Sequence, residues 1–84
     1  MSLLFPLKTK KFKLRDRDVT VRELTAGERS EVAKKIGEDK FLSTGLVAVY
    51  GCIDPKISEE HVQGESDEAI GKIASEIMIL SGMK

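Results

Sequence analysis

The stretch KKFKLRDRDVTVRELTAGE, residues 10–28, joins a pattern with a period of two residues to the start of a helix. Phe12 and Leu14 alternate with basic residues, and after RDRD the residues Val19 and Val21 alternate with polar ones. Two alternating runs joined by a short Asp-containing turn predict a β-hairpin with one buried face. The turn has no Asn-Gly or Asp-Gly pair, so the sequence leaves its type and register open.

A capping box follows the hairpin. Thr25 and Glu28 have the T-x-x-E spacing in which each side chain accepts a hydrogen bond from the other residue's backbone amide. We therefore expect a helix to begin here and to stop at Gly37. Its outer face is charged, and its apolar stripe is narrow, consisting of Val32, Ala33 and Ile36.

The longest apolar run lies in residues 39–53, where we expect a second helix. Its length favours a helix, although its β-branched residues leave a buried strand as the alternative. The pair Asp54-Pro55 should end it. Because Val47 and Ala48 widen its apolar stripe almost all round, we expect this helix at the centre of the core. The stripe consists of Phe41, Leu42, Leu46, Val49, Tyr50 and Ile53.

Two more helices are expected near the C-terminal end of the sequence. Ser58 is placed to cap a helix of one or two turns that ends at Gly64. Ser66, followed by Asp67 and Glu68 at the positive end of the helix dipole, predicts the start of the last helix. One face of that helix carries Ile70, Ile73, Ala74, Ile77 and Leu80.

The expected fold class is α+β, a hairpin region (1–24) followed by a small bundle of about four helices, two of them short (25–84). The 84 residues form one domain, 1–84. A chain of this length buries roughly 60–65% of its unfolded surface, so its core provides little net stability. Association with a partner, or with copies of itself as a homo-oligomer, would supplement that core.

Charge is unevenly distributed along a chain whose formal net charge is zero. Residues 1–24 carry seven basic and three acidic side chains, and residues 25–84 carry seven basic and eleven acidic ones. A nucleic-acid surface needs a larger positive excess, so we interpret the basic residues as a solvated face and expect no nucleic-acid partner. The longest apolar run is too short to span a bilayer, and the N-terminus lacks the features of a signal peptide. We expect a cytoplasmic protein.

The residues that most often perform chemistry do not form a recognisable site. His61 is the single histidine, and no C-x-x-C, H-x-x-x-H or D-x-D-x-D spacing accompanies it. Cys52 is the single cysteine and lies in an apolar run, as a small buried residue does. The glycines are dispersed and form no phosphate-binding loop. The sequence predicts no enzyme, no metal site and no cofactor.

A helix-turn-helix is the sharpest alternative. Val32, Ala33, Ile36 and Gly37, followed by Leu46, partly match its core positions and turn glycine. The match then fails, because the would-be recognition helix begins EDKFLSTG, with an acidic start and apolar residues where base-reading side chains belong.

The order of the elements resembles the tail assembly chaperones of long-tailed bacteriophages and prophages. The resemblance rests on a basic alternating hairpin ending VTVRELTAGER, a charged helix, an apolar helix ending VYGCIDPKIS, and a final helix ending IMILSGM. It covers nearly the whole chain but is a similarity of layout and includes no catalytic signature.

The resemblance implies a binding protein without catalysis. Such chaperones coat the tape measure protein in the host cytoplasm, help recruit tail tube proteins, and are absent from the finished virion. Methionine side chains adapt to varied apolar partners. The apolar residues least needed by the predicted core are Met78, Ile79 and Met83, and we predict them as partner contacts.

Overall fold

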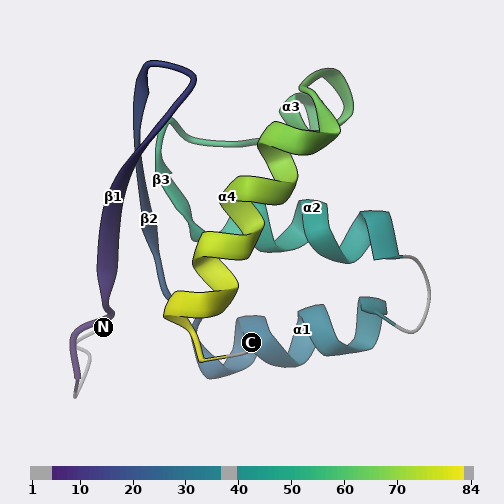
Figure 1. The fold of residues 1–84 in the computed structure, drawn as a ribbon. Coiled ribbons are helices and arrows are strands. Elements are labelled where there is room, and N and C mark those ends of the chain that lie inside the picture. Colours follow the sequence, from purple (N-terminus) through teal and green to yellow (C-terminus); the bar gives the residue numbers. More distant parts are fainter. Residues whose placement is uncertain (1–4, 37–39, 83–84) are drawn as a thin grey trace.

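The computed structural model describes residues 5–36 and 40–82, with side chains described outside residues 36–43. Figure 1 shows a small sheet on one side, α4 running alongside it, and α2 and α1 on the far side of α4. The predicted α+β class, an N-terminal hairpin followed by four helices, is confirmed. The elements are β1 (Thr9–Leu14), β2 (Arg17–Arg22), α1 (Ala26–Ile36), α2 (Lys40–Gly51), β3 (Cys52–Asp54), α3 (Glu59–Gly64) and α4 (Asp67–Leu80).

The hairpin closes through a two-residue turn. Leu14 and Arg17 are the last paired residues, and between them Arg15 (φ 51°) and Asp16 (φ 65°) both adopt left-handed backbone angles. Positive φ at both central positions defines the type I′ turn, whose twist matches that of paired strands. The turn that the sequence left open is therefore one of the two common two-residue hairpin turns, built without glycine.

The sheet has a third strand that the sequence did not predict. Its strand order is β1-β2-β3, and β3 pairs antiparallel with β2 through Val21↔Cys52 and Thr20↔Asp54. The predicted helix over 39–53 is therefore wrong at its end, because α2 stops at Gly51 and the chain leaves it to satisfy the backbone groups of β2. Ile53, expected on the apolar helix stripe, lies at an irregularity in the pairing and is 47% exposed.

The other predicted helices are confirmed with one correction. Ser58 caps α3 and Ser66 caps α4, as expected. In α1, Val32 is buried but Ala33 is exposed, because the helix presents too narrow a face to the core for both. The expected stop at Gly37 lies outside the described residues, as do the side chains of Ile36, Phe41 and Leu42.

The core is formed by one face of the sheet, α4 and α2. Val19 and Val21 on β2 face α4, and the predicted stripe of α4 is buried except for Leu80, which is half-buried. None of the side chains described in α2, residues 44–51, is exposed, so its central position is confirmed. The core consists of Val19, Val21, Leu24, Val32, Val47, Ala48, Cys52, Ile57, Val62, Ile70, Ile73, Ala74 and Ile77.

α2 and α4 approach each other closely at Gly51. A Cβ atom placed on Gly51 would lie 2.6 Å from both Cδ1 and Cγ2 of Ile77, a side chain with no exposed surface. Helix packing at this point therefore requires a residue without a side chain.

Two glycine substitutions should have opposite effects on stability. We expect Gly51→Ala to lower the free energy of unfolding by about 1–3 kcal/mol, because Ile77 has no free space to move into. Gly71→Ala, within α4 and with nothing within 4 Å of the added Cβ, should raise it by up to about 1 kcal/mol. Urea denaturation measures both; equal effects would contradict the close approach at Gly51.

Candidate functional site

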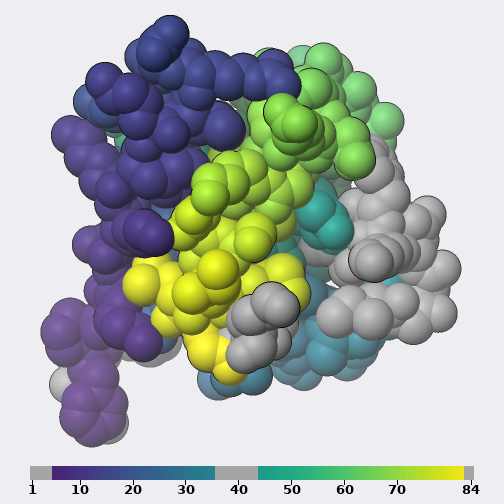
Figure 2. Space-filling view, in the orientation of Figure 1, coloured from purple at the N-terminus to yellow at the C-terminus, as the bar shows by residue number. Residues whose placement is uncertain are grey.

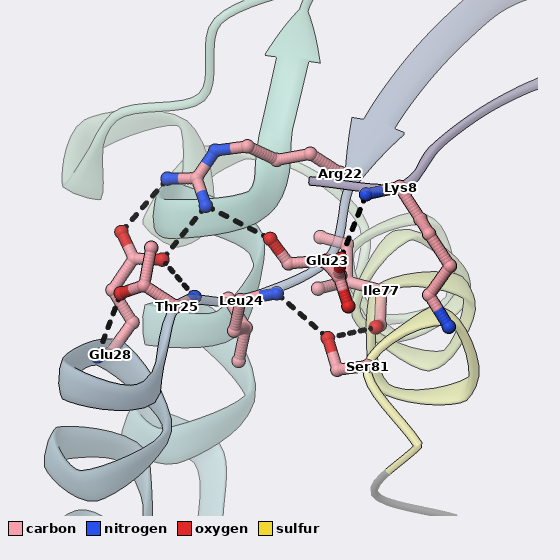
Figure 3. Close-up of polar contacts among 8 residues, drawn as sticks. All are labelled: Lys8, Arg22, Glu23, Leu24, Thr25, Glu28, Ile77 and Ser81. Atoms are coloured by element: carbon pink, nitrogen blue, oxygen red, sulfur yellow. Dashed lines mark hydrogen bonds and ion pairs between the residues drawn. The ribbon is translucent and has the colours of Figure 1, made fainter. Parts of the chain in front are cut away.

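A cluster of hydrogen bonds joins the end of β2 to the start of α1 (Figure 3). Arg22 donates from Nη1 to Glu28 Oε1 and from Nη2 to Glu28 Oε2, both at 2.8 Å. The Thr25 N–H donates to Glu28 Oε1 at 2.9 Å and the Glu28 N–H donates to Thr25 Oγ1 at 3.2 Å, which confirms the predicted capping box. The hydrogen bonds from Arg22 hold the pKa of Glu28 below its usual value. The same hydrogen bonds raise the pKa of Arg22.

The same junction is tied to the end of α4 and to the segment before β1 (Figure 3). The Leu24 N–H donates to Ser81 Oγ at 2.8 Å, and Ser81 Oγ donates to the Ile77 carbonyl at 2.7 Å. The Lys8 N–H donates to Glu23 Oε1 at 2.8 Å, and the Glu23 N–H donates to the Lys8 carbonyl at 2.9 Å. Polar side chains at this end of the molecule therefore connect segments of the fold.

Glu76 is a buried carboxylate with two cationic partners. It accepts from Lys10 Nζ at 2.6 Å and from Lys72 Nζ at 2.7 Å. These hydrogen bonds, that of Lys10 first, lower the pKa of Glu76. Lys72 Nζ also lies 5.9 Å from the centre of the Phe12 ring. The group links β1 to α4, and its two lysines and one carboxylate leave it with a net charge of +1.

His61 and Cys52, the two residues with the most reactive side chains, also have structural roles. His61 completes the capping box of α3, since its Nδ1 accepts from the Ser58 N–H at 3.1 Å, which places the proton of the neutral ring on Nε2. Cys52 is buried, as expected, its Sγ donates to the Pro55 carbonyl at 3.0 Å, and burial raises the pKa of its thiol. Within residues 5–36 and 40–82 no three His, Cys, Asp or Glu side chains are grouped so as to hold a metal ion.

The predicted partner contacts Met78, Ile79 and Met83 have different surroundings. Met78 is half-buried and packs against the core. Ile79 is 54% exposed, on the side of α4 opposite the buried stripe. Met83 lies outside the described residues. Of this set, Ile79 is therefore the residue whose described position leaves it accessible to a partner.

A cavity of about 320 Å³ lies under the hairpin turn, at the end of the molecule where β1 and β2 meet the beginning of α4. In the space-filling view the hairpin tip reaches over to the region of α3 and the start of α4 (Figure 2). Both strands of the hairpin, the segment after β3, and α4 contribute the apolar part of the cavity wall. We call it the hairpin cavity; its apolar lining is Leu14, Val19, Pro55, Ile57, Ala69, Ile70 and Ile73.

The rim of the hairpin cavity is mainly cationic. Arg15, Arg17 and Lys56 line it together with His61 and one carboxylate, Glu65. Arg15 forms an exposed ion pair with Glu68 at 3.2 Å. The side chains of Arg17 and Lys56 form no hydrogen bond or ion pair with any residue that the structure describes, so their charges are available to a ligand.

A second, smaller hollow of about 210 Å³ lies between α2 and α3. Its lining includes Gly45, Leu46, Val49 and Val62. A Cβ atom on Gly45 would lie 2.7 Å from Val62 Cγ1, so the two helices pack closely beside this hollow.

Sequence reasoning did not find the hairpin cavity, because its walls come from four segments that become neighbours only in the fold. Part of the cavity could have been inferred from Arg17. It lies two residues before Val19 on β2, so its side chain is on the same face of the sheet as the buried valines and faces the helices. The buried position of Glu76 was also missed, since its two lysine partners are 4 and 66 residues away in sequence.

None of the family models, curated proteins or solved structures compared with this chain matches it. Among the described helices there is none with the length and apolar character needed to cross a membrane.

The ion pair of Arg22 with Glu28 should be visible in the pH dependence of stability. Glu28→Gln retains an oxygen for the Thr25 N–H but removes the charge, so we expect the free energy of unfolding at pH 7 to fall by about 1 kcal/mol. Because the folded-state pKa of Glu28 lies below its unfolded value, its contribution is present above the unfolded pKa and is lost as the pH falls through the folded pKa. The difference between the two proteins should therefore shrink at acid pH.

The matched control is Glu31→Gln on the same helix. Glu31 pairs with Lys34 at 3.7 Å, and both side chains are more than half exposed, so this change should leave stability almost unaltered at every pH. Chemical denaturation across the pH range measures all three proteins. A Glu28→Gln variant as stable as the wild type at pH 7 would show that the ion pair contributes nothing.

Proposed function

We propose that this chain is a tail assembly chaperone of a long-tailed phage or prophage. It binds the tape measure protein, here called the client, in the host cytoplasm, helps recruit tail tube proteins, and catalyses no reaction. The identity of the client comes from the resemblance in layout, in particular VTVRELTAGER followed by VYGCIDPKIS. The binding role is argued from the surface.

The observation that carries the proposal is that the polar side chains are used to build the fold, whereas the hollows on the surface are largely apolar. His61, Glu28 and Glu76, the natural candidates for acid–base chemistry, are each held in hydrogen bonds that build the fold. The hairpin cavity and the hollow between α2 and α3 are instead lined largely by apolar side chains. An apolar concave surface on a small domain favours binding of another protein's apolar side chains.

A small DNA-binding regulator is the alternative, and α2 would be its recognition helix. A recognition helix needs a freely exposed face that can enter the major groove. All side chains described in α2, residues 44–51, are buried or half-buried, since the helix packs against α1, α3 and α4. This arrangement favours the chaperone proposal over the DNA-binding one.

Co-expression with the tape measure and tail tube proteins of the same genome tests the proposal. We expect the chain to keep the tape measure protein soluble and to co-purify with it, and the complex to persist when salt is raised. DNA binding would instead weaken on the order of a thousandfold or more between about 50 and 200 mM salt. Failure to co-purify with either protein, together with salt-sensitive binding to operator DNA, would replace this proposal with the alternative.

The exposed residue of the sequence-predicted contact set can be tested directly. We expect Ile79→Lys to reduce the amount of tape measure protein recovered several-fold, because a charge would replace an accessible apolar contact. Ile53→Lys is the matched control, since Ile53 is similarly exposed but lies on β3. Equal recovery with the two variants would remove Ile79 from the contact surface.

A further inference from the structure

We propose that the hairpin cavity is the docking site for an acidic segment of the client, with one large apolar side chain in the cavity and a carboxylate beside it on the rim. This inference rests on the proposed function, because the tape measure protein supplies the segment.

The floor of the cavity selects an apolar group. Val19, Ile57 and Ile70 form part of it, and they are buried residues of the core. In the described part of the chain no buried side-chain nitrogen or oxygen lacks a hydrogen-bond partner. A polar ligand on this floor would lose its own hydrogen bonds to water without replacement, whereas an apolar side chain would gain from leaving water.

The size of the cavity admits one large side chain as its occupant. Its volume of about 320 Å³ is at the bottom of the range of roughly 300–1,000 Å³ found for small-molecule sites. A large aliphatic or aromatic side chain fits such a space, and the backbone that carries it would then lie across the rim. Insertion of one apolar anchor into a pocket is a usual way for a peptide to dock on a protein.

The rim selects the charge beside that anchor. Arg17 and Lys56 stand on different walls, β2 and the segment after β3, and neither has an ionic partner among the described residues. His61 adds a hydrogen-bond donor, because its Nδ1 is occupied by the Ser58 amide and the proton is on Nε2. Glu65 is the single carboxylate of the lining, so the rim as a whole attracts an anion.

The rim can be tested by reversing its free charges. We expect R17E/K56E to bind overlapping synthetic peptides of the tape measure protein about tenfold more weakly than the wild type does. The peptides that the wild type binds should combine a large apolar residue with a neighbouring Asp or Glu. Added salt should weaken their binding by less than about tenfold, far less than it weakens DNA binding, because the apolar anchor is not screened by salt. The matched control is K8E/K13E, which changes the net charge equally at two exposed residues outside the cavity, one just before β1 and one within it. It should alter binding by less than about twofold.

The floor can be tested without changing charge. Ala69 is half-buried on the wall of the cavity, so Ala69→Leu places a larger side chain where the anchor would sit. We expect A69L to fold as the wild type does and to lose peptide binding about tenfold. Ala33→Leu, on the exposed face of α1, is the control and should bind normally. Circular dichroism of each variant confirms that a loss of binding is not a loss of fold.

The outcomes separate the two proposals. If the wild type does not co-purify with the tape measure protein, the proposed function fails and this inference fails with it. If the wild type co-purifies but R17E/K56E and A69L do so equally well, the docking site alone is wrong. Preferred binding of basic peptides would also overturn it. So would a change in the sedimentation of the variants without client, because the cavity would then be occupied by a second copy of the chain.

Discussion

The apolar face of α4 is the surface on which both parts of the fold are assembled. The hairpin packs on one side of the helix and α2 packs on the other, so Ile77 is left with no exposed surface. Gly51, which lies against Ile77, is the last residue of α2, and from there the chain turns to join the sheet. The segment after β3 then contributes Pro55, Lys56 and Ile57 to the lining of the hairpin cavity.

The parts of the fold that depend on local pattern could be predicted from the sequence. Alternation at Phe12, Leu14, Val19 and Val21 predicted the hairpin, and T-x-x-E and serine caps predicted where helices begin. The third strand could not be predicted in this way, because three residues are too few to show a period of two. Only its pairing with β2, which joins Cys52 to Val21, 31 positions earlier, and Asp54 to Thr20, distinguishes it from a last helical turn.

The candidate site illustrates the same limit. The cap at Thr25 and Glu28 is local and was predicted, but the guanidinium that completes it comes from the preceding strand. The single histidine was considered for chemistry, and its position at the third residue of α3 gives it the capping role more often filled by Glu or Gln. The hairpin cavity brings together residues 14–19, 55–57, 61–65 and 69–73. No pattern along the sequence predicts that these four segments are neighbours.

β1 has a consequence for how the protein behaves at high concentration. It is the long outer strand of the described sheet, so the backbone groups along one of its sides have no partner strand. Such an edge can add a strand from a neighbouring molecule and so begin aggregation. Lysines at positions 10, 11 and 13 within the strand, and at 8 just before it, make that addition electrostatically unfavourable between identical chains. Charge thus protects this edge of the described sheet against self-association.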